Sequence, residues 1–270
     1  MLSRTEHPQK PLIIIGGGVG PMAGVELHRK IIGRTPNVDG DGDNLPIVHI
    51  CRPAEVSDRS AWLIDGSGPN PGDQMAELVL EVLRGRRGGG RTIAAVPCNT
   101  FHSERIFSQF RRRLEAPPAS GLKIIDMLDS TVAELKGRFS TGSRIGLLAT
   151  DGTVRSGVWR SALEAAGFIP VLPGPEMQQR VHRLIYSPEW GLKAVYPPSP
   201  EAAAEFAQLQ NSLAGGESTG CGGSCGTEAV ILGCTELPLA AETLCSPPAA
   251  PLINPVDCLA DALIAECLDP

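Results

Sequence analysis

Aromatic residues, long apolar runs and an excess of positive charge are all scarce or absent in this chain of 270 residues. Aromatics make up only 4% of it, which favours cores built from Ala, Val, Leu and Ile. No apolar run approaches the ~20 residues that a helix needs to cross a bilayer, so we expect no membrane-spanning segment. The net charge of −6 argues against a nucleic-acid-binding protein, because such proteins carry a basic face. The basic cluster Arg111–Arg113 is typical of the solvated end of a helix.

The start of the chain, residues 1–10, is polar and lacks the apolar core of a signal peptide. We therefore expect a cytoplasmic protein, whose eight cysteines stay reduced. Cys221 and Cys225 lie in a Gly-rich segment, 215–226, with no second pair of metal ligands nearby, which favours a flexible surface loop over a metal site. Four other cysteines sit among apolar residues and are predicted to be small buried hydrophobes: Cys51, Cys245, Cys258 and Cys267.

Short apolar runs alternate with helical patterns along the chain. The apolar runs predict strands at 12–15, 47–50, 93–96, 123–126, 145–149, 168–172, 229–232 and 252–253. The helical patterns lie at 23–32, 73–83, 158–166, 200–213 and 255–267. Because strands that alternate with helices form largely parallel sheets, the sequence predicts an α/β protein.

The two halves of the chain repeat one order of elements. Each half opens with a strand, a Gly-containing turn and a helix, and each closes with a buried strand that ends in cysteine. The repeat predicts two pseudo-symmetric, doubly wound, Rossmann-like domains, with the active site in the cleft between them. We expect the first domain at 11–125 and the second at 126–252, with a C-terminal helix, 253–270, packed on the first.

Two short motifs follow the closing strands: Pro97-Cys98-Asn99-Thr100 and Gly233-Cys234-Thr235-Glu236. Each motif places one thiol at the carboxyl end of a strand, where open α/β sheets bind ligands. Two thiols that face each other across a small molecule can remove a proton from one face and return it to the other, which indicates a cofactor-free racemase. A helix N-terminus just after each cysteine would lower the pKa of its thiol. The polar side chains of both motifs can donate hydrogen bonds to a substrate carboxylate.

The glycine turn after the first strand allows two interpretations. Gly18-x-Gly20-x-x-Ala23 matches a dinucleotide fingerprint, but Cys51-Arg52 stand where the acidic residue of that fingerprint belongs. A tight turn at Gly18 and Val19, whose N–H groups bind a carboxylate at a helix start, fits better.

The cysteine motifs also allow other interpretations. A hydrolase would pair Cys98 with a histidine base, and His102 lies four residues further on. However, Glu236 stands after Cys234 and no matching histidine follows, so symmetric acid/base thiols fit better. Both cysteines could also be plain core residues at strand ends.

Several stretches, in order along the chain, resemble one family. They are 17–23, Ser57-Asp58-Arg59-Ser60, 97–102, 147–153 and 233–237, with two further echoes at 191–194 and 254–257. On these stretches the chain resembles the cofactor-independent aspartate/glutamate racemase superfamily, and most of all its aspartate racemase branch. Glu236 favours that branch, because glutamate racemases usually carry His at this position.

The resemblance implies roles for the matching residues. Cys98 and Cys234 would be the two acid/base thiols, and Arg59 would bind a substrate carboxylate. Lys193 would approach the same side-chain pocket as Arg59. Three residues would hold the α-carboxylate: Asn99, Thr100 and Thr235. The remaining substrate-binding candidates are Gly18, Val19, Thr150, Asp151 and Glu236.

Asp151 departs from the family pattern, in which Thr is frequent at that position. If its carboxylate reaches the side-chain end of the substrate, it would repel a dicarboxylic amino acid. The substrate would then be a different amino acid.

The resemblance implies a PLP-independent amino-acid racemase, most of all an aspartate racemase, that uses no metal, nucleotide or other cofactor. It also implies that the protein is a homodimer. Its ligand would be a small amino-acid substrate, and it would bind neither nucleic acid nor a membrane. Two alternatives stay open. One is a decarboxylase or a cis–trans isomerase of dicarboxylic acids on the same scaffold, and the other is a non-catalytic amino-acid-binding protein.

Overall fold

Two four-stranded parallel sheets form the frame of the molecule, which a computed structural model describes at residues 10–86, 90–117, 119, 121–216 and 226–269. The first sheet has the order β2-β1-β3-β4 and the second the order β6-β5-β7-β8. The strands are β1 (Leu12–Gly16), β2 (Ile47–Ile50), β3 (Thr92–Ala95), β4 (Leu122–Ile124), β5 (Arg144–Ala149), β6 (Ile169–Val171), β7 (Ala229–Gly233) and β8 (Leu252–Ile253). Because the two sheets repeat one strand order, the predicted α/β fold with two pseudo-symmetric, doubly wound halves is confirmed.

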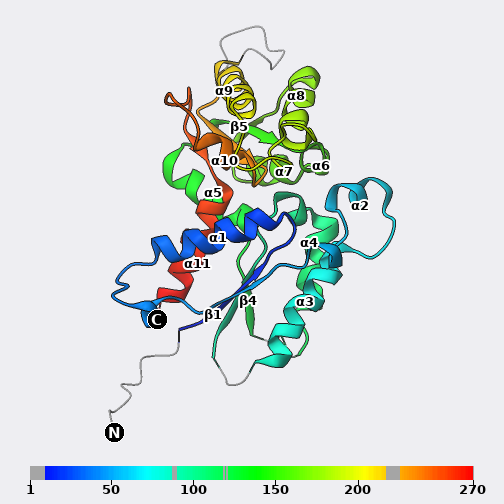
Figure 1. Cartoon of the computed structure of the whole chain (residues 1–270), viewed down its shortest axis with the longest axis vertical. Coiled ribbons are helices and arrows are strands. Elements are labelled where there is room, and N and C mark those ends of the chain that lie inside the picture. Colours follow the sequence, from blue (N-terminus) through cyan, green and yellow to red (C-terminus); the bar gives the residue numbers. More distant parts are fainter. Residues whose placement is uncertain (1–9, 87–89, 118, 120, 217–225, 270) are drawn as a thin grey trace.

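Helices cover the sheets and alternate with the strands along the chain (Figure 1). They are α1 (Pro21–Arg34), α2 (Arg59–Asp65), α3 (Pro71–Gly85), α4 (Glu104–Arg113), α5 (Met127–Arg138), α6 (Asp151–Ser156), α7 (Val158–Ala165), α8 (Pro175–Tyr186), α9 (Pro200–Gly215), α10 (Leu237–Ala241) and α11 (Pro255–Leu268). Proline begins many of them, where its missing N–H removes no helical hydrogen bond. Within the described part of the chain, each helix is too short or too polar to span a membrane.

Alternate residues of the central strands face opposite layers of helices. In the first sheet, Ile14 and Ala94 share a core with α3 and α4, whereas Ile13 and Ile15 share one with α1 and α11. The second sheet repeats this arrangement, with α8 and α9 on one face and α5 and α7 on the other. Burial on both faces explains why these strands are continuous apolar runs rather than alternating ones.

The C-terminal helix α11 returns to the first sheet, although it follows the second sheet in sequence. Its Leu259 and Leu263 pack in one core with Ile13 and Leu27. In Figure 1, α11 lies beside α1 in the lower lobe, away from β5 and α8. Ion pairs reinforce the contact, since Lys30 Nζ of α1 lies 2.6 Å from the carboxylate of Asp257.

Some local predictions need correction. The Gly-containing turn predicted after the strand at 145–149 is the start of α6 instead, because the Thr150 hydroxyl caps the helix by accepting the N–H of Thr153 (3.2 Å). Cys51 and Cys245 are exposed and Cys258 is half-buried, whereas Cys267 is buried as predicted. Apolar neighbours in sequence were misleading, since Cys51 follows the edge strand β2 and Cys245 lies beyond α10. Cys221 and Cys225 lie outside the described residues.

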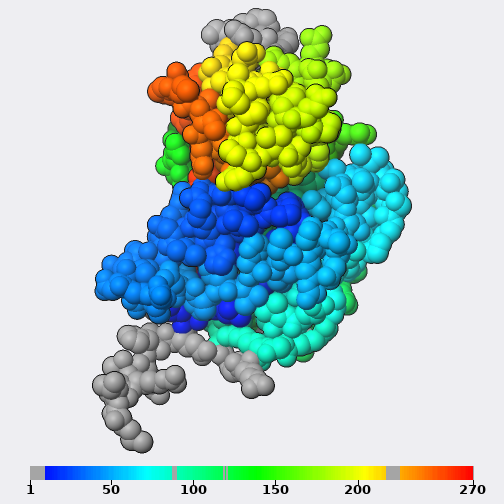
Figure 2. Space-filling model, in the orientation of Figure 1, coloured from blue at the N-terminus to red at the C-terminus, as the bar shows by residue number. Residues whose placement is uncertain are grey.

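Helix α2 was not predicted, because it contains no buried residue and therefore shows no apolar stripe. Asp58 begins it by accepting the N–H of Ala61 (2.7 Å), and Gly66 ends it in the left-handed conformation. Figure 2 shows the segment around α2 projecting from the lower lobe alongside the upper one. This projection carries the stretch Ser57–Ser60 from the first half of the chain towards the second.

Candidate active site

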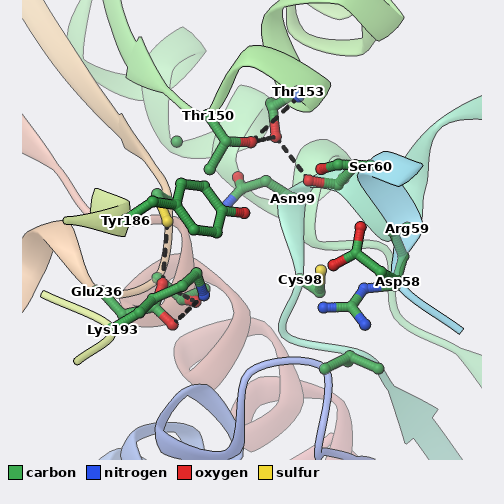
Figure 3. Close-up of a pocket in the computed structure, with 15 residues that line it drawn as sticks. Asp58, Arg59, Ser60, Cys98, Asn99, Thr150, Thr153, Tyr186, Lys193 and Glu236 are labelled. Carbon is green, nitrogen blue, oxygen red and sulfur yellow. Dashed lines mark hydrogen bonds and ion pairs between the residues drawn. The ribbon is translucent and has the colours of Figure 1, made fainter. Parts of the chain in front are cut away.

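A small pocket lies where the carboxyl ends of the two sheets meet (Figure 3). β3 of the first sheet and β7 of the second each lead into it, so the pocket is built from both halves of the chain. Its volume is about 30 Å³, enough for about two water molecules. The lining residues are Val19, Asp58, Arg59, Ser60, Cys98, Asn99, Thr100, Thr150, Thr153, Tyr186, Lys193, Gly233, Cys234, Thr235 and Glu236.

The structure brings most of the predicted site residues into this lining, but not Gly18 and Asp151. The carboxylate of Asp151 accepts a hydrogen bond from Gln178 Nε2 (2.7 Å) and lies 3.4 Å from His182 Nδ1. Both partners are on α8, so they hold the Asp151 charge beside that helix. Gly18 adopts φ = +82°, a left-handed conformation that supports the turn next to Val19.

Five lining residues were not among the predicted site residues: Asp58, Ser60, Thr153, Tyr186 and Gly233. Asp58 and Ser60 flank Arg59 within a stretch that resembles the family, which was a usable signal. Tyr186 ends α8, and no motif marks it in the sequence. In Figure 3 its ring extends into the pocket, with Lys193 beneath it. Lys193 Nζ lies 5.7 Å from the centre of that ring.

Cys98 is buried at the end of β3, just before a 3₁₀ turn at Asn99–His102. Its carbonyl oxygen accepts a hydrogen bond from His102 Nδ1 (2.9 Å), because a carbonyl can only accept. The Nε2 atom of the same ring then accepts the N–H of Met127 at 3.3 Å. His102 is therefore neutral with its proton on Nδ1, and it anchors the backbone of Cys98 rather than acting on its thiol.

Cys234 is buried at the end of β7 and bonded to its neighbour Glu236. The Cys234 thiol donates to Glu236 Oε2 over 2.9 Å, and Lys193 Nζ lies 2.5 Å from Oε1. Burial, together with the negative charge of Glu236, raises the pKa of the Cys234 thiol well above its ordinary value, although Lys193 opposes the rise. The predicted lowering of this pKa by a helix N-terminus is wrong, because α10 begins only at Leu237 and burial dominates.

Glu236 is ionised and Lys193 is charged in this arrangement. Burial alone would raise the pKa of Glu236, but the Lys193 ammonium and the hydrogen bonds from Cys234 and Lys193 outweigh burial and lower it. Burial likewise disfavours the charged Lys193, yet its electrostatic interactions with Cys234 and with the Glu236 carboxylate raise its pKa overall. Burial raises the pKa of Tyr186 to about 12, so its phenol stays protonated at neutral pH.

Threonine hydroxyls link the two halves beside the thiols. The hydroxyls of Thr100 and Thr153 lie 2.8 Å apart, and Thr153 is 3.0 Å from the hydroxyl of Thr150. Thr100 belongs to the first half and the other two to the second, and all three are buried. Neighbouring Asn99 is also buried, and its Oδ1 accepts the indole N–H of Trp159 at 3.0 Å.

Arg59 supplies a cation opposite the Lys193–Glu236 pair. One guanidinium nitrogen, Nη1, donates to the carbonyl of Ser57 at 3.3 Å. The Nε atom is buried and lacks a hydrogen-bond partner among the residues that the structure describes. An anion would stabilise a buried charged donor of this kind by accepting its hydrogen bond. A carboxylate matches the planar geometry of the guanidinium group. In Figure 3, Arg59 lies next to Cys98.

Tight packing of α2 on α6 closes one side of the pocket. A Cβ atom at Gly152 would lie 2.2 Å from Ser60 Oγ and 2.7 Å from Ser60 Cβ. Gly152→Ala should therefore push α2 away and displace Arg59. Because overpacking of this kind costs about 1–3 kcal/mol, we expect the free energy of unfolding to fall by about that amount, as denaturant unfolding of the variant would show.

The control for this prediction is the double variant Gly152→Ala with Ser60→Gly. Ser60→Gly removes both atoms that would clash, so the double variant should have the unfolding free energy of the Ser60→Gly single variant. An unchanged unfolding free energy in Gly152→Ala would contradict the tight packing of this contact.

The sequence and the fold were compared with those of known proteins. The Asp/Glu/Hydantoin racemase family model matches residues 17–263. Three solved structures share the fold. Aspartate racemase from Picrophilus torridus is 21% identical, with a TM-score of 0.65 over 96% of this chain and 94% of that chain. An aspartate racemase homologue from Pyrococcus horikoshii is 19% identical, with a TM-score of 0.69 over 96% and 100%.

The third structure is glutamate racemase from Francisella tularensis in complex with D-glutamate. It is 15% identical, with a TM-score of 0.57 over 96% of this chain and 81% of that chain. At these identities the likeness concerns the fold, whereas the family model spans both cysteine motifs. The resemblance predicted from the sequence is thus confirmed, and the chain belongs to the Asp/Glu/hydantoin racemase family.

Proposed function

We propose that the protein is a cofactor-independent amino-acid racemase that acts on aspartate with two opposed cysteines. One observation carries the proposal: Cys98 and Cys234 follow equivalent strands of two pseudo-symmetric sheets and line one pocket. The pocket also holds hydroxyl and amide donors and the Arg59 cation, whose Nε has no hydrogen-bond partner within the described part of the chain. These are the groups that a dicarboxylic amino acid needs at both of its ends.

The protonation states support different roles for the two thiols. Racemisation requires one thiolate and one thiol, and Cys234 is the thiol of the resting site because burial and Glu236 raise its pKa. Cys98 would then be the base: its thiolate takes the α-proton, and the electron pair of the broken C–H bond passes into the α-carboxylate. Cys234 would give its proton to the opposite face of the same carbon, which leaves a thiolate beside Lys193.

The polar groups support a binding mode for aspartate. Asn99 and the hydroxyls of Thr100 and Thr235 would hold the α-carboxylate, where negative charge grows as the proton leaves. Arg59 would bind the side-chain carboxylate. The Asp151 carboxylate lies outside the pocket lining and accepts a hydrogen bond from Gln178, so it would not oppose a dicarboxylic substrate.

Proton exchange tests the proposal directly. The protein is incubated in D₂O with L- and D-amino acids and no added cofactor, and NMR follows the loss of the α-proton signal. We expect exchange together with inversion for aspartate. Exchange with another amino acid would keep the mechanism and change the substrate. A complete lack of exchange with all of them would refute a racemase, and assays for CO₂ release and for fumarate from maleate would then test the alternatives.

Glu236→Gln should make the Cys234 thiol more reactive. The substitution removes the negative charge that raises the pKa of Cys234 and leaves Lys193, which lowers it. Loss of one like charge shifts a pKa by about one unit or more, so we expect iodoacetamide to alkylate Cys234 roughly tenfold faster at pH 8. Peptide mass spectrometry measures the rate. Exposed Cys51 in the same sample is the internal control, and an unchanged Cys234 rate would contradict the assigned pair.

The homodimer and the cytoplasmic location that the sequence suggests stay predictions. Size-exclusion chromatography with light scattering tests the first, and cell fractionation tests the second.

A further inference from the structure

Trp159 lies directly behind the pocket residue Asn99. It belongs to α7 in the second half of the chain, is fully buried, and donates its indole N–H to Asn99 Oδ1 over 3.0 Å. Asn99 belongs to the first half and follows Cys98. The hydrogen bond therefore crosses between the two halves next to one of the proposed catalytic thiols.

The indole determines which end of the Asn99 amide is free. An indole N–H donates and cannot accept, so Oδ1 rather than Nδ2 must face Trp159. The Nδ2 atom is buried and, in the ranges that the structure covers, has no hydrogen-bond partner. A buried donor without an acceptor is destabilising, and a carboxylate that enters the pocket would supply the acceptor.

We propose that Trp159 is a positioning residue, which holds the Asn99 amide so that Nδ2 is ready to bind a carboxylate of the ligand. The proposal rests on the proposed function for the identity of that ligand. The hydroxyls of Thr100 and Thr153 lie 2.8 Å apart and also join the two halves of the chain. These contacts fix the positions of the donors of one half relative to those of the other. Substrate affinity thus depends on a side chain of α7 that lies outside the pocket lining.

Trp159→Phe tests the proposal, because it keeps an aromatic ring and removes the N–H. The probe is succinate, a dicarboxylate without an α-amino group, and calorimetry measures its Kd. Without the indole donor, Asn99 Oδ1 is left unpaired whenever Nδ2 binds the ligand. We therefore expect the Kd to rise roughly tenfold, with a matching rise in KM and a smaller change in kcat. If Trp159→Phe does not fold, site-specific benzothienylalanine, which replaces the N–H by sulfur, is used instead.

A double-mutant cycle separates positioning from general packing. In an Asn99→Ala background, Trp159→Phe should change the succinate Kd by less than about twofold, because the residue through which it acts is gone. Trp190→Phe, a partly buried indole of the same half, is the matched control and should leave the Kd unchanged. Equal losses in both backgrounds, or an unchanged Kd in Trp159→Phe, would overturn the proposal.

The succinate measurement also distinguishes this proposal from the proposed function. Wild-type protein that binds succinate but exchanges no α-proton would refute the racemase and leave the role of Trp159 supported or overturned by the cycle. Wild-type protein that does not bind succinate would overturn the role of Trp159, whatever its activity.

Discussion

Replacing either Cys98 or Cys234 with serine is expected to lower racemisation by roughly 10²–10⁴-fold, the usual contribution of one general acid or base. A serine hydroxyl keeps the position of the sulfur, but it holds its proton far too tightly to act as a base at neutral pH. In Cys98→Ser the proposed base is lost. In Cys234→Ser the donor to the opposite face is lost, together with the thiol that binds Glu236. Polarimetry on L- and D-aspartate measures the rates in both directions.

The matched control is Cys51→Ser, because Cys51 is exposed and lies outside the pocket lining. Its racemisation rate should equal that of the wild type. Thermal unfolding of each variant shows whether a loss of activity reflects a loss of structure. A rate near that of the wild type in either Cys98→Ser or Cys234→Ser would rule out the two-thiol mechanism.

Arg59→Gln is expected to have the second-largest effect, a fall of roughly 10–100-fold in kcat/KM for aspartate. The value follows from the loss of a charge-assisted hydrogen bond worth about 1.5–3 kcal/mol. The side chain keeps its polar character, whereas the planar fork that matches a carboxylate is lost. Most of the change should appear in KM, because the side-chain carboxylate binds equally in the ground state and the transition state.

The choice of substrate identifies which carboxylate Arg59 binds. Alanine has an α-carboxylate and no side-chain carboxylate, so we expect Arg59→Gln and the wild type to exchange its α-proton at nearly the same rate. An equal loss for both amino acids would place Arg59 at the α-carboxylate instead. Arg155→Gln, an exposed arginine on α6, is the control for a general change in charge.

The parts of the fold that could be predicted are those set by residues adjacent in sequence. The runs at Ile13–Ile15 and Val230–Leu232 are buried on both faces, so all their residues are apolar. Each run therefore predicts a strand even when the neighbouring strands of the sheet are unknown. The residues after a strand must lie at its carboxyl end, and for this reason both thiols could be assigned to one region. Helix α2 could not be found in this way, because Trp62 and Leu63 are only half-buried and its seven residues show no helical apolar stripe.

The parts of the site that could not be predicted depend on side chains that are far apart in sequence. Tyr186 comes from the end of α8, and its role depends on how that helix lies beside Lys193. Asp151 was placed among the substrate-binding candidates from the family resemblance, yet its carboxylate accepts a hydrogen bond from Gln178 and lies 3.4 Å from His182, both on α8. Hydrogen bonds between separate helices decide such orientations, and no local pattern records them.

The sequence by itself determined the order of strands and helices along the chain, the repeat of the halves, the two cysteine motifs and the family, because all of these follow from local apolar runs and short stretches of identity. Only the tertiary structure decided the protonation of Cys234 and the orientation of Asn99. A pKa depends on burial and on charges nearby in space, and here Glu236 and Lys193 set it from positions 2 and 41 residues away. The Asn99 amide is oriented by Trp159, 60 residues further along the chain.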